Sequence, residues 1–168
     1  IKPDPEGPLI ARVFRTRIDP FVQKLSFIRV YSGTLRRDDV VHVSSTRKSL
    51  KIGPLLELQG AESHPVDAAG PGDIVAVAKT EDLHTGTLLG DYSLADVAYP
   101  RPMVGLAVMP KSRNDETKLS GAMHKVAEED PTFKVDRDPQ THEMVVMGMS
   151  ELHLAIIRER LHRREKLD

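Results

Sequence analysis

The sequence predicts two domains, an all-β barrel or sandwich followed by a smaller α+β module. Short runs rich in Val, Ile and Leu fill the first half, and turn residues rather than an amphipathic helix separate them. The second half shows two helical patterns among its strand-like runs, in the order βαββα. A stretch with two prolines, ADVAYPRPM, separates the two sequence patterns. We therefore expect the first domain at residues 9–96 and the second at residues 97–168.

Residues 1–8, IKPDPEGP, are polar and rich in proline, which removes backbone donors and disfavours a helix. They predict a linker that leads into the first domain. Five runs then predict strands: LIARVF, LSFIRVYS, DVVHVSS, LKIGPLLEL and DIVAVAK. Turn residues at 32–34, 37–39 and 70–73 punctuate these runs. Such close spacing is typical of a small closed barrel or a sandwich.

The second domain opens with the strand-like run MVGLAVMP. Ser112 and Asn114 offer N-caps for a helix that we expect to reach about Glu129, because Pro131 forces the residue before it out of the helical region. One face of this helix is apolar, since four residues recur at helical spacing: Leu119, Ala122, Met123 and Val126.

Two further strands, TFKVDRD and EMVVMGM, flank a turn at residues 139–142, and Ser150 predicts the cap of a last helix. The order βαββα is that of a ferredoxin-like fold without its last strand. We therefore expect a ferredoxin-like α+β module whose last strand is lacking. We also expect both ends of the chain to be internal positions of a longer protein.

Composition excludes several classes of protein. The formal net charge is -1, so charge alone does not indicate a general polyanion binder. The absence of cysteine excludes disulfides and thiolate metal sites. No apolar run reaches the roughly 18 residues of a membrane span, and no signal peptide is visible. We expect no membrane association.

Motifs for catalysis are also missing. There is no GxxxxGK[ST] loop, and AGPGD lacks the lysine and the following helix of a phosphate cradle. The seven histidines do not follow a metal-ligand spacing, and GMSEL lacks the second glycine of GxSxG. Residues 128–130, Glu-Glu-Asp, predict a solvated helix end rather than an acid–base pair. We expect no catalytic residue, cofactor or metal in this chain.

Basic residues gather in two places. One group surrounds a predicted barrel turn and the loop after it: Arg29, Arg36, Arg37, Arg47 and Lys48. The other lies on the last helix, where Glu159 and Glu165 offer salt-bridge partners. Both groups could be solvated faces, or arginine could contact the phosphates of RNA. Aromatic residues are only 4%, which argues against base stacking, so any RNA contact is expected through phosphates and shape.

Several stretches resemble the elongation factor G family of translational GTPases. PDPEGPL resembles the lead-in from that family's nucleotide-binding domain, and LSFIRVYSGTLRRDDVV its second-domain signature. VAEEDPTF at 126–133 and MGMSELHLAII at 147–157 resemble two motifs of its third domain. The motifs keep the family's order and extend over nearly the whole chain.

The resemblance implies a barrel similar to domain 2 of elongation factor Tu, in contact with small-subunit ribosomal RNA. It implies a third domain that touches the GTP-binding domain and a small-subunit ribosomal protein, beside the site of the antibiotic fusidic acid. GTP and Mg²⁺ are expected in the full-length protein, in a first domain that this chain lacks. The predicted RNA contacts are Arg29, Arg36, Arg37 and Lys48. The predicted interdomain or ribosomal interface comprises Gly148, Ser150, Glu151 and His153.

Two residues depart from the family pattern. Ser150 stands where the family usually has glycine, and Ala155 stands where ELHLE has its last glutamate. A serine can cap the helix, but it cannot adopt every backbone conformation open to glycine. These changes suggest a second elongation factor G-like paralogue.

The predicted function is therefore a fragment of a ribosome-dependent translational GTPase. This fragment would dock on the ribosome and couple GTP hydrolysis to translocation, in a cytoplasmic and monomeric protein. The alternatives are a relative that recycles or protects ribosomes, and a stand-alone ribosome-binding module. For His153 the sequence predicts a hydrogen bond to the backbone or a neighbour, with an interface contact or chemistry as alternatives.

Overall fold

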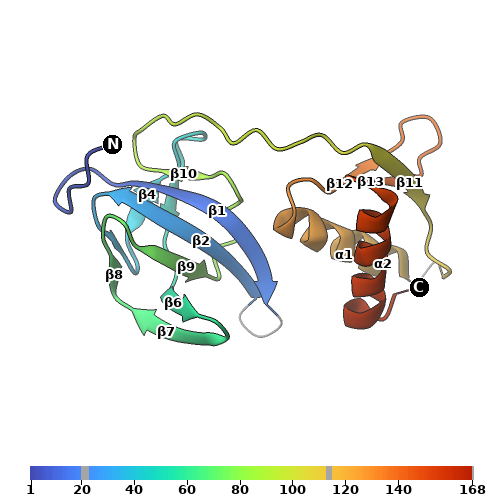
Figure 1. Cartoon of the computed structure of the whole chain (residues 1–168), viewed down its shortest axis with the longest axis horizontal. Helices are drawn as coiled ribbons and strands as arrows, with labels where there is room; N and C mark the ends of the chain where they lie inside the picture. Colours follow the sequence, from blue (N-terminus) through green and yellow to red (C-terminus); the bar gives the residue numbers. More distant parts are fainter. Residues whose placement is uncertain (20–22, 113–114, 168) are drawn as a thin grey trace. The chain divides into compact units, whose positions relative to one another are not determined.

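The computed structural model describes residues 1–19, 23–112 and 115–167. Contacts divide the chain into two compact units, Ile1–Val97 and Ala98–Asp168 (Figure 1). Each unit has its own hydrophobic core. None of the helices in the described residues is long and apolar enough to cross a membrane.

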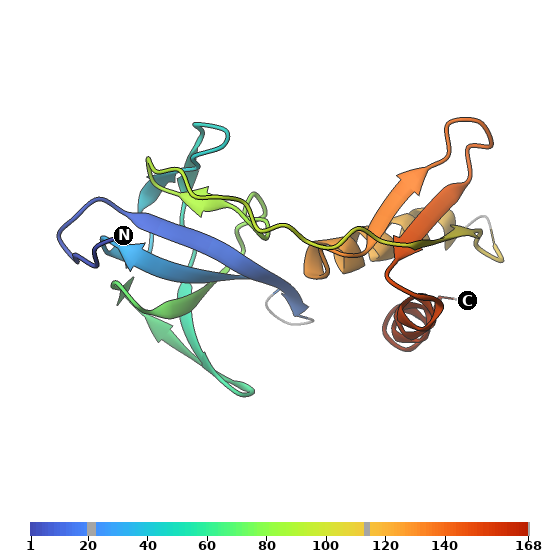
Figure 2. The ribbon, with the colours of Figure 1, turned by 45° about the horizontal axis from the view of Figure 1, so that its top comes forward.

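Unit 1 is built from antiparallel strands around a main core, with a smaller apolar cluster formed by Leu25, Ala76 and Ala78 (Figures 1 and 2). The strands are β1 (Ile10–Asp19), β2 (Gln23–Ser32), β3 (Leu35–Arg36), β4 (Val40–His42), β5 (Ser49–Lys51), β6 (Leu55–Gln59), β7 (Glu62–Val66), β8 (Ala68–Ala69), β9 (Ile74–Ala78) and β10 (Leu88–Leu89). Six of them form a sheet in the order β10-β1-β2-β9-β6-β7, and β3–β8 and β4–β5 form two short ribbons. A bridge between Val43 and Leu89 joins one ribbon to the sheet.

The barrel forms because alternate residues of its strands are apolar and point inward. Val13 of β1, Ile28 and Val30 of β2 and Val77 of β9 are fully buried in the core. The predicted all-β barrel is confirmed.

One local expectation is corrected in unit 1. The run LKIGPLLEL is two strands, β5 and β6, because Pro54 lacks a backbone donor and Gly53 approaches the backbone of Ala78 too closely for a side chain. Residues 1–8, the predicted linker, contact the barrel. Asp4 accepts hydrogen bonds from Gly33 N (2.8 Å) and from the Ser32 hydroxyl, so the lead-in is fixed against the turn after β2.

Unit 2 has the order β11 (Val104–Val108), α1 (Glu116–Glu129), β12 (Lys134–Arg137), β13 (Met144–Gly148) and α2 (Glu151–Glu165). Its sheet order is β11-β13-β12, and both pairs are antiparallel. Both helices pack on one face of this sheet, where Leu119 and Met123 of α1 meet Leu154 and Ile157 of α2 around Val146 of β13. This is the predicted ferredoxin-like βαββα order.

The ends of the helices follow local rules only in part. α1 ends at Glu129, as predicted, because Asp130 is extended before Pro131. Its N-cap is Asp115, which makes no side-chain cap hydrogen bond, rather than the predicted Ser112. The other predicted cap, Asn114, lies outside the described residues.

β11 pairs with β13 on one side, and the described residues place no strand on its other side. An apolar groove of about 470 Å³ runs beside β11. It is lined by β11 residues such as Leu106, by core residues of both helices, by Phe133 and by Val146 of β13. Leu106 is half-exposed there. The groove therefore marks an open side of the unit 2 core.

Candidate functional site at the strand–helix junction

β13 passes into α2 through three residues, Gly148, Met149 and Ser150. Ser150 has an extended backbone (φ -160°), and its hydroxyl accepts a hydrogen bond from the amide of His153 at 3.1 Å. This is the geometry of an N-cap, which satisfies an amide that has no partner within the helix. The predicted cap is confirmed, and the backbone of Ser150 is extended rather than left-handed.

Gly148 is buried at the end of β13. A Cβ on this residue would lie 2.7 Å from Leu154 Cδ2 and 3.0 Å from His153 Nδ1. Its carbonyl accepts a hydrogen bond from Met103 N at 2.9 Å. Close packing against the first turn of α2, rather than an unusual φ, is therefore the reason for a glycine at this position.

The His153 ring connects two segments. Its Nδ1 accepts a hydrogen bond from the amide of Met149 at 3.1 Å, and its Nε2 lies 3.0 Å from Asp130 Oδ2. Because Nδ1 is an acceptor, the ring proton belongs on Nε2, which donates to the carboxylate. His153 thus fixes the start of α2 to the end of α1, as the predicted hydrogen-bonded histidine.

Asp130 was expected at a solvated helix end, and this expectation is wrong. Its Oδ1 accepts from the Thr132 amide (2.8 Å) and the Thr132 hydroxyl (2.6 Å), and its Oδ2 pairs with His153. Partial burial raises the pKa of Asp130, but the hydrogen bonds from Thr132 and His153 outweigh it, so the pKa lies below the ordinary 3.8. The sequence signal that could have revealed this is Asp-Pro-Thr, since Asp readily bonds the backbone two residues on.

We predict that acid weakens unit 2 through Asp130. Because the pKa of Asp130 is lower in the folded state, its contribution to stability is present above about pH 4 and is lost as the pH falls through the folded pKa. Asp130→Asn should lower the free energy of unfolding at neutral pH and make it less sensitive to acid. Urea unfolding followed by far-UV circular dichroism measures this, because the described helices both belong to unit 2.

The exposed Asp136 of β12 provides the control, since its carboxylate bonds only the neighbouring amide of Arg137. Asp136→Asn should leave the acid dependence of the helical signal unchanged. Equal acid dependence in Asp130→Asn and the parent chain would contradict the assignment.

The junction contains no catalytic arrangement. The Ser150 hydroxyl is used as a cap, and the described residues include no group of three side chains that could hold a metal ion. The AGPGD turn does not fit the phosphates of GTP either. The amide of Gly70 already donates to Asp73 Oδ2 within the turn at 2.8 Å, and the amide of Gly72 donates to the carbonyl oxygen of Val30 in β2 at 2.9 Å.

The four predicted interface residues therefore differ in exposure. Ser150 and Glu151 are exposed, whereas Gly148 is buried and the His153 side chain is 21% exposed. Leu152, in the same turn, is 70% exposed. Gly148 and His153 are placed to shape the junction, and its outer surface consists of Ser150, Glu151 and Leu152.

The structure places the four predicted RNA contacts on different elements. Arg29 lies on the outer face of β2, and Arg36 is an exposed residue of β3. Arg37 pairs with Asp38 at 3.5 Å, and Lys48 is exposed in the loop between β4 and β5. Arg36 and Arg37 are adjacent, but no hydrogen bond or ion pair in the described residues joins them to Arg29 or Lys48.

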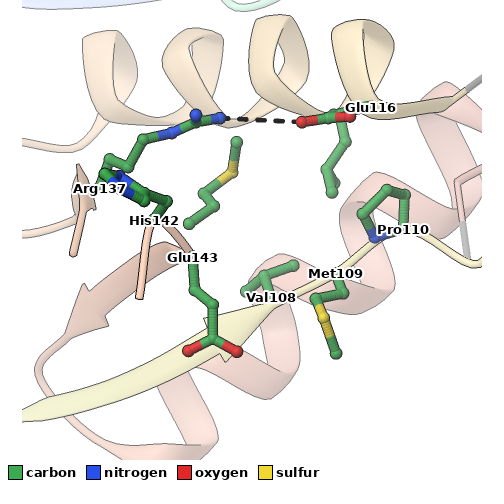
Figure 3. A pocket seen from close by; sticks show the side chains of 9 residues that line it. Val108, Met109, Pro110, Glu116, Arg137, His142 and Glu143 are labelled. Carbon is green, nitrogen blue, oxygen red and sulfur yellow. Dashed lines mark ion pairs between the residues drawn. The ribbon is translucent and has the colours of Figure 1, made fainter. Parts of the chain in front are cut away.

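A separate pocket of about 280 Å³ lies at the far end of unit 2, between the end of β11, α1 and the β12–β13 turn (Figure 3). Its charged lining is partly self-paired, since Arg137 and Glu116 are 3.7 Å apart. Figure 3 shows the Glu143 carboxylate directed away from Arg137. The pocket does not adjoin the residues of the junction.

Comparison with known proteins gives matches to both units. A family model for Elongation Factor G, domain III, matches residues 99–168, and one for Elongation factor G domain 2 matches residues 8–91. The chain is 39% identical, over 171 aligned positions, to a protein named Elongation factor G from Amoebophilus asiaticus (strain 5a2). That alignment covers 99% of this chain and 24% of the relative.

A crystal structure of a protein from Thermus thermophilus is similar in fold. The TM-score is 0.79 at 33% sequence identity, and the match covers 93% of this chain and 24% of that protein. The chain thus spans about a quarter of the length of the proteins that it matches.

Proposed function

This chain belongs to the elongation factor G family, as its second and third domains, and we propose that it docks a ribosome-dependent translational GTPase on the ribosome. In this proposal unit 1 contacts RNA and protein of the small subunit. Unit 2 couples GTP hydrolysis, in a separate GTP-binding domain of the same protein, to translocation. GTP and Mg²⁺ would be held by that domain, since the residues present here do not fit them.

One observation supports the coupling role most directly. The two third-domain motifs, VAEEDPTF and MGMSELHLAII, are joined by the hydrogen bond between Asp130 and His153. A force on the outer surface of Ser150, Glu151 and Leu152 would therefore move the end of α1 as well. Small displacements are passed on by such rigid contacts, because packed elements cannot deform continuously.

Full-length protein with ribosomes tests the proposal. We expect ribosomes to stimulate GTP hydrolysis, and we expect movement of tRNA and mRNA in a translocation assay. Dissociation of ribosomes into subunits without translocation would instead support a recycling relative. No stimulation of GTP hydrolysis by ribosomes would contradict the proposed function.

The predicted basic residues allow a narrower test. We predict that Arg36→Ala with Arg37→Ala weakens association of the chain with small ribosomal subunits. Each lost phosphate contact should reduce the slope of log affinity against log salt by about 0.7 to 0.9, so the pair should reduce it by at most about 1.8. Because Arg37 already pairs with Asp38, we expect the reduction of the salt slope to be smaller than this maximum.

Sedimentation of the chain with small subunits at several salt concentrations measures this change. Lys118→Ala with Lys134→Ala removes the same charge from exposed positions of unit 2 and provides the control. An unchanged affinity and salt slope in the Arg36 and Arg37 variant would exclude these two residues from the contact.

A further inference from the structure

One face of the barrel sheet is rich in arginine. The inward residues of β1 and β2, such as Ala11, Val13 and Ile28, belong to the core. Because side chains alternate along a strand, the polar residues of β1 lie on the other face, next to a small apolar cluster around Leu25 of β2. Four arginines lie on this face: Arg12, Arg15, Arg17 and Arg29.

A β-bulge adds aromatic side chains to this face. The register between β1 and β2 shifts between Val13 and Arg15, so that Phe14 and Arg15 both reach Phe27 of β2. The ring centroids of Phe14 and Phe27 are 6.3 Å apart, and the Arg15 guanidinium lies 5.9 Å from the Phe27 centroid. Phe14 is 43% exposed. A tilted pair of rings, with a guanidinium over the half-buried Phe27 and with Phe14 exposed, therefore lies on this face.

The positive charge of this face is not neutralised by ion pairs within the described part of unit 1. None of the ion pairs among the described residues involves Arg15, Arg17 or Arg29. Arg12 donates to a backbone carbonyl, that of Ala95, at 2.9 Å. Arg12 and Arg29 are also direct partners in the register of β1 and β2. Like charges opposite each other destabilise a sheet, so this arrangement costs stability.

Protection of a sheet edge explains only some of these arginines. Charged residues on an edge strand prevent pairing with other chains. β10 pairs with β1 only at Ala11 and Arg12, so Arg15 and Arg17 lie on a part of β1 that has no strand on that side among the described residues. Arg12 and Arg29, in contrast, lie where both neighbouring strands are present. Edge protection therefore does not account for this pair of arginines.

We propose that this surface, the arginine face (Arg12, Phe14, Arg15, Arg17, Phe27 and Arg29), binds RNA that has unpaired bases. Arginines would contact phosphates, since their forked donors match phosphate oxygens. Phe14 would stack on an unpaired base, as exposed aromatic rings do in proteins that bind single strands. The identification of the RNA as ribosomal rests on the proposed function.

The sequence did not indicate this face. Arg12, Arg15 and Arg17 were not among the predicted contacts, and the low aromatic content argued against stacking. The alternation of ARVFRTRID along one strand is a signal for part of the face. The bulge that puts Phe14 and Arg15 on the same face of β1 is seen only in the structure.

Fluorescence anisotropy of the whole chain with a short labelled single-stranded RNA tests the proposal. Arg15→Ala, Arg17→Ala and Arg29→Ala together should weaken binding by at least about tenfold and reduce the salt slope by about 2, at roughly 0.7 per contact. Phe14→Leu should weaken binding of the single strand by about tenfold and leave binding of an RNA duplex unchanged, since a duplex offers no free base.

Arg160→Ala, Arg163→Ala and Arg164→Ala on α2 together remove the same charge and provide the control. An equal loss in this control would show binding by general charge and would overturn the proposal. So would an unchanged affinity in the arginine-face variant, or an equal effect of Phe14→Leu on single-stranded and duplex RNA. Competition by polyglutamate as strong as that by RNA would assign the face to acidic proteins instead.

The outcome is separable from that of the proposed function. If the full-length protein shows ribosome-stimulated GTP hydrolysis but the arginine-face variants bind RNA normally, only the inference on this face fails. If those variants lose RNA binding while ribosomes do not stimulate GTP hydrolysis, the face stands and the proposed function fails. Circular dichroism of each variant confirms that a loss of binding is not a loss of folding.

Discussion

Phe133→Ala is expected to destabilise unit 2 by about 3 to 5 kcal/mol while unit 1 keeps its stability. Phe133 is a large, fully buried side chain, 2% exposed, in the core formed by α1, α2 and the sheet. Its replacement removes the apolar area of the ring and leaves a cavity next to a groove that already opens on one side of this core. The surrounding side chains are therefore not expected to move in and fill this cavity.

Urea unfolding separates the two units in this experiment. The helical circular dichroism signal reports unit 2, and NMR signals of β1 and β2 amides report unit 1. The helical transition should move to lower urea while the β1 and β2 signals keep their midpoint. Phe133→Leu should cost clearly less, because it keeps an apolar side chain in the site. A joint shift of both transitions would mean that the two units unfold together.

The same variant also bears on the junction. Phe133 follows Thr132, whose amide and hydroxyl bond Asp130. Loss of the ring would loosen the loop that holds the Asp130 carboxylate against His153. A weakened stimulation of GTP hydrolysis by ribosomes, in variants that remain folded at low temperature, would connect this core to the proposed coupling.

Local signals in the sequence were enough for the elements whose limits are set by nearby residues. Pro131 fixes the end of α1 and Ser150 fixes the start of α2, because both act on a backbone within three residues of themselves. The polar edge strand β7 was missed, since its residues are mostly exposed and show no apolar alternation. The order of the elements in unit 2 could also be read from periodicity.

Contacts between distant residues could not be read in this way. Asp130 and His153 are separated by 23 positions, and only the packing of α2 beside the end of α1 brings them together. The β1–β2 bulge depends on the pairing of two strands, so no residue near Phe14 in the sequence indicates it. The junction was located correctly by its motif, but the function of its individual side chains came from the tertiary structure.

Gly90→Ala is expected to destabilise unit 1 by about 2 to 5 kcal/mol, the sum of a left-handed backbone and a steric overlap. Gly90 follows β10 with φ +97°, and a Cβ on it would lie 1.8 Å from the carbonyl oxygen of Leu9. Its amide donates to His42 O at 2.8 Å, so the backbone cannot move away without losing that bond. Leu9 leads directly into β1, and the overlap would displace the first strand of the barrel.

Gly86→Ala is the matched control, because Gly86 has nearly the same φ, +98°, and nothing lies within 4 Å of its Cβ position. It should show only the conformational cost, about 1 to 3 kcal/mol. The difference between the two variants, measured by urea unfolding through the β1 and β2 amide signals, is therefore the steric term alone. Equal losses would mean that Leu9 yields to the methyl group. In that case the path of the chain into β1 is set by the hydrogen bonds of Asp4 to the turn after β2, not by Gly90.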